Sequence, residues 1–429
     1  MTKQFERVSW IDGANVYEVN VRQYTAEGTF AAFMKHLPRL KDMGIKILWL
    51  MPVTPISRKM RLGSLGSYYA CSSYTEVNPE FGTLDDLKEL VKEAHQLEMK
   101  LIIDWVANHT GWDHQWTQEH PDWYKKDAQG NFTDAHGWTD VIDLNYASKE
   151  MRAAMIEAMM FWINECDIDG FRCDMAHLVP LDFWRIARQH CDALKTLFWL
   201  AETEVPEYHE VFDVSYAWEW MHVTEKIPKQ IASLQHMKEV LEKYQQQYLP
   251  GSRKLFFTSN HDENSWNGTE YEKYGDGAKA FAVFCCLWNG MPLIYSGQEL
   301  PNYKRLKFFD KDQIEWRQDI RLHNFYKSLL ELKSENKALH ASAEIFELTT
   351  GNDEKIFACL FVKGFYKVLV LLNFSSNDRV HCTIKHEKLE GNYKNLFSGI
   401  QHKLNATENF ELQHWEYMVY FCDDNKIEK

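Results

Sequence analysis

The stretch Thr83–Trp105, "TLDDLKELVKEAHQLEMKLIIDW", contains the two patterns that decide the fold. Up to Met99 its apolar residues recur at helical spacing, Thr83 can cap the amino end, and acidic residues fill the first turn. From Lys100 the pattern changes to a short apolar run that is typical of a buried strand. A helix followed at once by such a strand is the repeating unit of a parallel α/β fold.

Short apolar runs of this kind recur up to about residue 340, separated by longer segments of helical period. A second clear helical pattern begins at Ser148. The expected strands begin at Val16, Lys46, Lys100, Asp169, Leu197, near Val211, at Leu255 and at Pro292. Eight strands each followed by a helix predict a (β/α)8 barrel, so the α/β barrel is assigned to residues 1–340.

Two further segments depart from this alternation. Residues 110–143, after the third strand, are polar and rich in aromatic residues, and they are too long for an ordinary connection. We therefore expect a short inserted segment there. Residues 341–429 show short alternating runs with turn residues between them, which predicts a separate antiparallel β-sandwich domain.

The composition excludes several classes of function. Acidic residues (62) outnumber basic residues (48), giving a formal net charge of -14, and no run of Lys and Arg is interleaved with aromatic residues. We therefore expect no nucleic-acid or membrane partner. The apolar runs are too short to span a bilayer and the amino terminus shows no secretory pattern, so we expect a cytoplasmic protein, a trimmed signal being the open alternative. Nine cysteines without CxxC spacing indicate buried thiols in a reducing compartment.

Charged and polar residues stand at the carboxyl ends of the expected strands. In a parallel barrel these ends open on one face, where active sites are built. The residues are Asp104 at the end of the third strand, followed by Asn108 and His109, then Arg172 and Asp174 on the fourth strand, Glu202 at the end of the fifth, and His261 and Asp262 at the end of the seventh. Four carboxylates meeting in one barrel mouth would repel one another, so their recurrence favours a functional site over separate helix caps.

Arg172 and Asp174 are two residues apart on one strand, so both side chains point to the same side. A guanidinium beside a carboxylate favours its ionised form and fixes its orientation. Glu202 follows the apolar run "LFWLA", and apolar surroundings favour a protonated carboxyl. One ionised and one protonated carboxyl group are the nucleophile and general acid of a retaining glycosidase.

These residues also carry a resemblance to a known family. Four motifs resemble, in order, the short conserved regions of the α-amylase family of glycoside hydrolases, and two more resemble its eighth-strand motif and the stretch that joins its second strand to the next helix. They are "DWVANH" from Asp104, "GFRCDMAHLVP" from Gly170, "LAETEVPE" from Leu200, "FTSNHDENSW" from Phe257, "GMPLIYSGQE" from Gly290 and "YTEVNPEFGTLDDLKELV" from Tyr74.

The resemblance implies a role for each carboxylate. Asp174 corresponds to the nucleophile and Glu202 to the acid that protonates the leaving oxygen and then activates water. Asp262 corresponds to a third carboxylate that binds sugar hydroxyls and helps to distort the ring, while Arg172 orients Asp174.

The resemblance also implies a substrate-binding set around them. His109 and His261 correspond to two histidines that hydrogen-bond the sugar, with Asp104 and Asn108 as supports. Tyr69 corresponds to a tyrosine that stacks on the same sugar, although the chain has Tyr-Tyr-Ala where the family usually has Gly-Tyr-Asp.

The expected function is that of an α-amylase-type glycoside hydrolase that cleaves α-1,4 bonds of glucans or maltooligosaccharides with retention. Two alternatives stay open: a transglycosylase or isomerase of the same family, and a catalytically inactive barrel that serves as a binding or scaffold subunit. We expect a monomer or a small homo-oligomer with an α-glucan or maltooligosaccharide as its partner.

We expect no required cofactor. The first βα loop, "NVRQYTAEGTF", lacks the Asp/Asn/Gly-rich calcium pattern of many relatives. The resemblance leaves Asn108 as the one candidate metal ligand, to which Asp134, Asp140 and Asp143 of the inserted segment could add oxygens.

Tryptophans are candidate platforms on which a sugar ring could stack, with core packing as the alternative. Those considered are Trp112, Trp116, Trp123, Trp138, Trp218 and Trp220.

Overall fold

The computed structural model describes residues 5–249 and 251–422. The chain falls into two compact units, and each is described by itself. The first takes in Val16–Tyr216 and Lys304–Glu315, and the second takes in Trp10–Asn15, Ala217–Tyr303 and the chain from Trp316 on.

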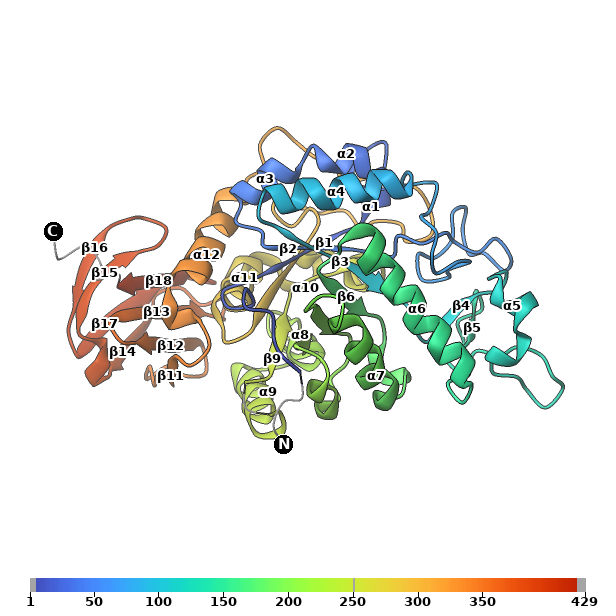
Figure 1. Cartoon of the computed structure of the whole chain (residues 1–429). Coiled ribbons are helices and arrows are strands. Elements are labelled where there is room, and N and C mark those ends of the chain that lie inside the picture. The colour runs from blue at the N-terminus through green and yellow to red at the C-terminus, as the bar shows by residue number, and fades with distance from the viewer. Residues whose placement is uncertain (1–4, 250, 423–429) are drawn as a thin grey trace. The chain divides into compact units, whose positions relative to one another are not determined.

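Eight parallel strands form a closed barrel in the order β1-β10-β9-β8-β7-β6-β3-β2, which confirms the expected (β/α)8 architecture (Figure 1). Neighbouring strands pair in register, so that Asp104 of β3 lies opposite Arg172 of β6. The strands are β1 Val16–Val19, β2 Ile47–Leu50, β3 Lys100–Trp105, β6 Gly170–Cys173, β7 Phe198–Ala201, β8 Val214–Tyr216, β9 Arg253–Phe256 and β10 Met291–Tyr295.

Helices follow most of these strands, as the sequence pattern predicts. Thr83 and Asp86 form a capping box at the start of the helix expected from Thr83. The helices are α1 Val21–Tyr24, α2 Phe30–Met34, α3 Leu37–Asp42, α4 Leu84–Gln96, α5 Trp116–Glu119, α6 Lys149–Cys166, α7 Leu181–Asp192, α8 Trp218–Thr224, α9 Leu234–Gln247, α10 Glu270–Tyr274, α11 Ala278–Leu287 and α12 His323–Glu335.

The seventh barrel strand is shorter than the sequence suggests. The run from Leu255 was expected to continue as a strand into His261 and Asp262, but β9 ends at Phe256. Polar side chains beyond that point bond to their own backbone, since Asn260 Oδ1 accepts the N–H of Glu263 at 2.8 Å. A single turn of π-helix then spans Glu263–Asn267.

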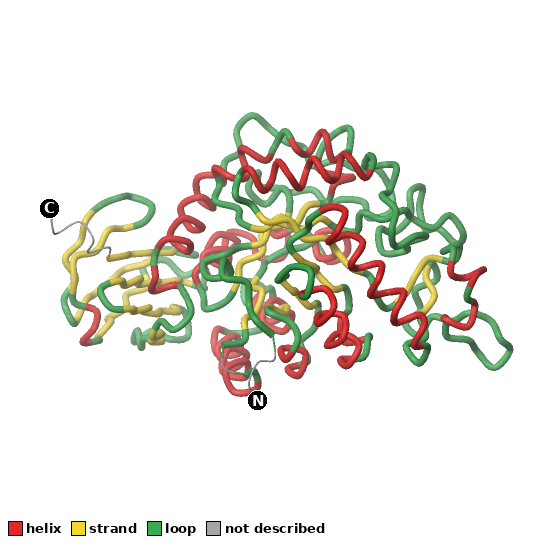
Figure 2. The backbone as a smooth tube through the Cα atoms, viewed as in Figure 1, coloured by secondary structure: helices red, strands yellow, loops and turns green. Residues whose placement is uncertain are grey.

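The segment inserted after β3 is mostly loop (Figure 2). It holds the antiparallel pair β4 (His109–Gly111) and β5 (Val141–Asp143), together with α5. Its aromatic residues give it a core of its own, because the buried rings of Trp116 and Trp123 pack edge to face with centroids 5.0 Å apart.

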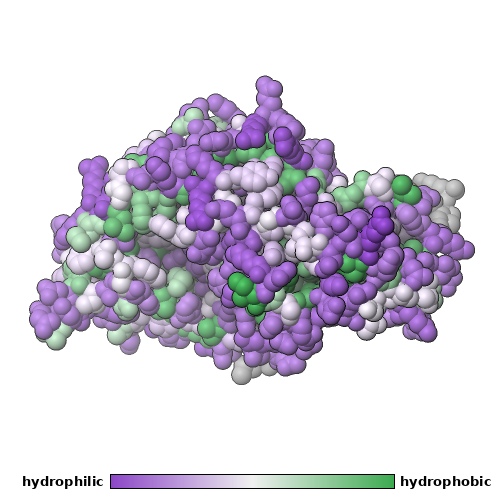
Figure 3. Space-filling view, turned by 180° about the vertical axis from the view of Figure 1, so that it is seen from behind, coloured by the Kyte–Doolittle hydropathy of each residue, from purple (hydrophilic) through white to green (hydrophobic). Residues whose placement is uncertain are grey.

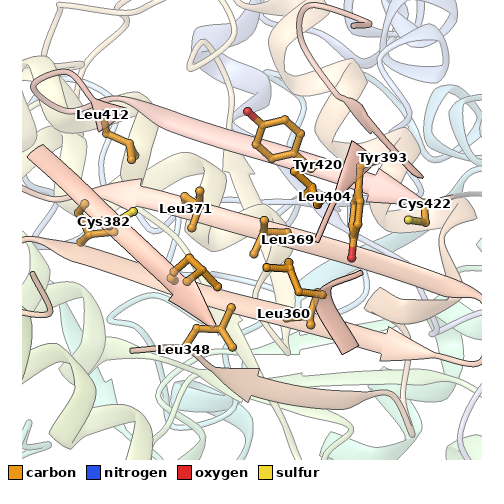
Figure 4. Packing of buried hydrophobic residues seen from close by; sticks show 14 of the residues in the cluster. Leu348, Leu360, Leu369, Leu371, Cys382, Tyr393, Leu404, Leu412, Tyr420 and Cys422 are labelled. Atoms are coloured by element: carbon orange, nitrogen blue, oxygen red, sulfur yellow. The ribbon is translucent and has the colours of Figure 1, made fainter. Parts of the chain in front are cut away.

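The last part of the chain forms antiparallel sheets, as expected for a sandwich. A six-stranded sheet has the order β11-β12-β13-β18-β15-β16, and β14 pairs with β17 in a second sheet. Residues of both sheets share one hydrophobic core, in which Leu369 of β13 and Leu412 of β17 are fully buried (Figure 4). The strands are β11 Glu344–Glu347, β12 Ile356–Lys363, β13 Tyr366–Asn373, β14 Val380–Lys385, β15 Gly391–Asn395, β16 Gln401–Leu404, β17 Thr407–Leu412 and β18 Tyr417–Cys422.

Within the second unit, aromatic residues of α11 and its C-cap contact β12 and the residue that follows β13. Phe281 stacks on Phe374 with ring centroids 4.3 Å apart, and Trp288 packs against Phe357 at 5.5 Å. The boundary at residue 340 between barrel and sandwich stays a prediction.

The surface drawn in Figure 3 is mostly hydrophilic, with hydrophobic side chains in separate small groups. Within the described residues, every helix is too short or too polar to cross a bilayer.

Candidate active site

One buried guanidinium joins three carboxylates at the ends of neighbouring strands. Arg172 Nη1 donates to Asp104 Oδ1 and to Asp174 Oδ1, each at 2.9 Å. Arg172 Nη2 lies 2.7 Å from Glu202 Oε2. The structure therefore brings together four of the residues that the sequence singles out: two lie on β3 and β6, and Asp174 and Glu202 directly follow β6 and β7.

Arg172 stays charged in this position. Burial by itself would lower its pKa, but the charges of Asp104 and Glu202 outweigh burial and raise the pKa well above its ordinary value. Arg172 Nε donates to the Tyr216 hydroxyl at 3.2 Å, and the guanidinium carbon lies 4.8 Å from the ring centre of Trp49. The cation is held by contacts on several sides.

Asp104 is held by donors on both of its oxygens, the first of which accepts from Arg172. Its second oxygen, Oδ2, accepts from Trp49 Nε1 at 3.2 Å and from the Tyr69 hydroxyl at 3.0 Å. Tyr69 is in turn stacked on Phe308, with ring centroids 6.3 Å apart and an angle of 14° between the planes. The hydroxyl of Tyr69 is thereby tied to the carboxylate cluster.

The surroundings of Glu202 are more polar than the preceding apolar run suggests. Besides the Arg172 ion pair, Oε2 accepts the backbone N–H of Met175 at 3.0 Å. Both groups favour a negative charge on this oxygen. The expectation of an apolar surround for Glu202 is therefore wrong for one face of the carboxyl group, because β6 and its turn supply donors from far along the chain.

The donor from Met175 depends on a turn that the sequence does not reveal. Two residues beyond the end of β6, Met175 has φ 39° and ψ 47°, in the left-handed region that few side chains adopt. This conformation aims its N–H at Glu202, while Asp174 N–H donates to Trp105 O at 3.0 Å. Strained backbone of this kind is often found at functional sites.

His109 and Asn108 lie where β4 of the inserted segment begins. Asn108 Nδ2 is 3.2 Å from His109 Nδ1 and 3.4 Å from Asp143 Oδ1. Burial lowers the pKa of His109 to about 4, even though the charge of Asp143 opposes this shift. His109 is therefore neutral near pH 7 and can donate one ring N–H.

The residues near Asn108 do not fit a calcium ion. Asn108 turns its amide nitrogen, not its oxygen, toward Asp143, and Lys125 Nζ lies 3.1 Å from the other oxygen of Asp143. Within the described residues, no three His, Cys, Asp or Glu side chains are grouped as metal ligands. Calcium takes six to eight oxygen ligands, so an ammonium and an amide nitrogen are the wrong partners for it.

His261 and Asp262 belong to the second unit and follow β9. His261 Nε2 lies 3.3 Å from Asp262 Oδ2, and the Asp262 side chain is 39% exposed. The next residue, Glu263, is buried and paired with Lys273 at 2.6 Å. This buried ion pair fixes the backbone that carries Asp262.

The tryptophans considered as sugar platforms divide into two groups. Trp116, Trp123 and Trp220 are buried, so they belong to the core. Trp112, Trp138 and Trp218 are partly exposed, and Trp138 packs edge to face on His109 with ring centroids 5.4 Å apart. Trp138 is therefore in contact with a predicted site residue.

Several contributors to the site were missed in the sequence. Trp49 and Tyr216 contact Arg172, the Met175 N–H binds Glu202, and Lys125 pairs with Asp143, which the sequence suggested only as a possible metal ligand beside Asn108. Trp49 and Tyr216 lie on barrel strands, and this position in the sequence could have indicated that they face the site.

Comparisons with known proteins agree with this architecture. The chain matches the family described as "Alpha amylase, catalytic domain" over residues 12–139 and 120–337. It is 24% identical over 394 residues to the alpha-amylase MalA of Haloarcula japonica, covering 87% of this chain but 57% of that relative's length.

Two solved structures resemble the whole chain. A noncanonic maltogenic alpha-amylase, AmyB of Thermotoga neapolitana, has a TM-score of 0.89 and 29% identity, covering 96% of this chain and 99% of that one. An alpha-amylase of Lactobacillus plantarum has a TM-score of 0.86 and 27% identity, with the same coverage of 96% and 99%.

Proposed function

The chain belongs to the alpha-amylase family of glycoside hydrolases, and from that premise we propose that it is a retaining enzyme that cleaves α-1,4-glucosidic bonds of starch- or glycogen-type glucans or maltooligosaccharides. The observation that carries the proposal is the Arg172 guanidinium in contact with Asp104, Asp174 and Glu202. The arrangement supplies one oriented nucleophile and one oriented acid at the end of adjacent strands.

In the first step, Asp174 attacks the anomeric carbon while Glu202 gives its proton to the leaving glycosidic oxygen. The bond from carbon to the leaving oxygen breaks as the glycosyl ester with Asp174 forms. In the second step, Glu202 takes a proton from water, which attacks the same carbon and releases Asp174. The two inversions together retain the anomeric configuration.

The contacts of Glu202 indicate which of its oxygens holds the proton. Oε2 faces Arg172 and receives the Met175 N–H, so it serves as the acceptor oxygen of the acid. We place the transferred proton on Oε1. In the ionised form after transfer, the same two contacts stabilise the charge on Oε2.

The remaining site residues are assigned to sugar binding. His109 donates a ring N–H to a sugar hydroxyl, and His261 and Asp262 contribute a second set of polar contacts. Tyr69, tied to Asp104 by its hydroxyl, offers its ring to the sugar face. Asn108 and Asp104 act through their neighbours and not on the substrate.

Product analysis tests the proposal. The protein is incubated with amylose, maltotriose, pullulan and a cyclodextrin, and the products are resolved by chromatography and by proton NMR before mutarotation. We expect shorter oligosaccharides released first as the α-anomer. Initial release of the β-anomer, or products that are all longer than the substrate, contradicts it.

Variants of the two carboxylates show whether the measured activity belongs to this protein or to a contaminating enzyme. Glu202→Gln is nearly isosteric and removes the proton donor, so kcat should fall about 10²- to 10⁴-fold with an unchanged melting temperature. Asp174→Asn should lower kcat at least as much. A folded Asp174→Asn protein with normal turnover would show that the nucleophile is elsewhere.

A further inference from the structure

Asp143 is a fully buried carboxylate in the inserted segment and needs partners for its charge. It ends β5, directly opposite His109 in the β4–β5 pair. Its Oδ2 lies 3.1 Å from Lys125 Nζ, and its Oδ1 lies 3.4 Å from Asn108 Nδ2. These two side chains are a cation on one side and an amide on the other.

The contact of Lys125 with Asp143 is built into the segment. The backbone N–H of Lys125 donates to Asp143 O at 2.9 Å, and Asp143 N–H donates to Thr133 O at 2.9 Å. Lys125 O in turn accepts the N–H of Thr133 at 3.2 Å. These backbone bonds fix the Cα of Lys125 beside Asp143, so its side chain reaches the carboxylate without any movement of the chain.

Asp143 determines which way the Asn108 amide faces. Asn108 presents its NH2 group to Asp143, whose Oδ1 accepts the hydrogen bond. The same NH2 group lies 3.2 Å from His109 Nδ1 and has two hydrogens, one for each neighbour. His109 Nδ1 is therefore the acceptor, and the single proton of the neutral ring is on Nε2.

We propose that Lys125 is a positioning residue: its ammonium fixes the carboxylate of Asp143, Asp143 orients Asn108, and Asn108 keeps the His109 proton on Nε2, where it can be donated to a sugar hydroxyl. The chain thereby supplies, from its own lysine, the positive charge that a metal ion would bring to this position. The contact between His109 and a sugar rests on the proposed glycosidase function. The tautomer of His109 does not depend on that function.

The first readout is the His109 tautomer, measured by nitrogen-15 NMR on histidine-labelled protein near pH 7. In the wild-type protein we expect an unprotonated Nδ1 and a protonated Nε2. In Lys125→Gln we expect Asp143 to lose its cation and the His109 signals to move toward a mixture of tautomers. A wild-type His109 with its proton on Nδ1 overturns the proposal.

The second readout is kinetic and uses two further variants. Lys125→Gln should lower kcat/KM about 10- to 100-fold on a maltooligosaccharide, and Lys125→Arg should restore most of it. Lys126→Gln is the matched control, because Lys126 lies over the Phe132 ring at 5.6 Å and has no place in the chain of contacts. Wild-type kinetics and an unchanged tautomer in Lys125→Gln would contradict the inference.

The third readout addresses the metal and does not need activity. The melting temperature of the wild-type protein should be the same with a chelator and with added calcium, since Lys125 already carries the charge. A clear rise with calcium alone overturns this part. If the wild-type protein cleaves no glucan, the proposed function is wrong. The NMR measurement of the His109 tautomer and the melting temperatures still test the role of Lys125. If Lys125→Gln does not fold, the wild-type tautomer and the kinetics of Lys125→Arg can still contradict the proposal.

Discussion

At the scale of single residues, Arg172 contacts three carboxylates, whereas the sequence predicts a contact with Asp174 alone. The spacing of Arg172 and Asp174 predicted one ion pair, and the structure confirms it at 2.9 Å. Glu202 follows a different strand, and no local sequence pattern predicts its contact with Arg172. Arg172 therefore bears on both groups that we assign to proton transfer and nucleophilic attack.

Removing this charge should change the pH dependence of the enzyme in one direction. In Arg172→Gln, both Asp174 and Glu202 lose a cation that favours their ionised forms, so both should titrate at higher pH than in the wild-type protein. Asp174 must be ionised and Glu202 protonated for the first step. We therefore expect the acidic and the basic limbs of the kcat/KM profile to move to higher pH.

Arg172→Lys is the companion variant. It keeps a positive charge but loses the planar fork that reaches three carboxylates, so activity should fall about 10²- to 10³-fold. Thermal melting of each variant serves as the control for folding. A lower melting temperature with an unshifted pH profile would mean that Arg172 is only a structural pillar.

At the scale of elements, helix α12 carries an unusual buried lysine within the second unit. Lys333 Nζ donates to Trp288 O at 2.7 Å, at the carboxyl end of α11, where the helix dipole favours a cation. Burial nevertheless lowers the pKa of Lys333 to about 7, and the nearby Arg253 adds to this effect, while Cys286 and Asp12 oppose it.

The lysine predicts a pH dependence of stability. Between about pH 7 and 10.5 the unfolded chain holds the Lys333 proton while the folded chain has released it, so the free energy of unfolding should rise with pH in this window. The slope from this one group approaches about 1.4 kcal/mol per pH unit. Below pH 7 the cost of burying the charge is fully present.

Lys333→Met tests this dependence by denaturant unfolding at several pH values. The variant should be more stable than the wild-type protein near pH 7, by about 1–4 kcal/mol, and the difference should shrink as the pH rises. Lys327→Met, on the same helix but partly exposed, is the control and should change neither stability nor slope appreciably. An equal stability difference at all pH values would argue against a neutral buried Lys333.

At the scale of the whole molecule, all nine cysteines are buried and carry thiols. Burial raises the pKa of Cys71 and of Cys286 to about 12, so neither is a thiolate near neutral pH. This agrees with the absence of CxxC spacing in the sequence.

A thiol titration checks this arrangement. In denaturant without a reductant, nine thiols per chain should react with a chromogenic disulfide reagent, whereas the native protein should react slowly because its sulfurs are shielded. Recovering fewer than nine after unfolding would mean that some pairs are oxidised.

The barrel was predictable because it depends on local periodicity. The change from helical spacing to an apolar run at Lys100 appears as α4 followed by β3, and the weak run near Val211 appears as β8 at Val214–Tyr216. The extent of the seventh strand was not predictable, since the local pattern does not show that the chain turns at Asn260, whose side chain accepts the N–H of Glu263.

By itself the sequence placed Asp104, Arg172, Asp174 and Glu202 at or next to strand ends, and the two-residue spacing of Arg172 and Asp174 predicted that these two side chains share a face. Tertiary structure alone decided that Glu202 meets Arg172 and the Met175 N–H, and that Asp143 lies between Lys125 and Asn108. The physical reason is the distance along the chain between interacting residues. Periodicity reports how a segment faces its neighbours, whereas the partners of a buried charge come from whichever strands and turns the closed barrel and the inserted segment bring against it.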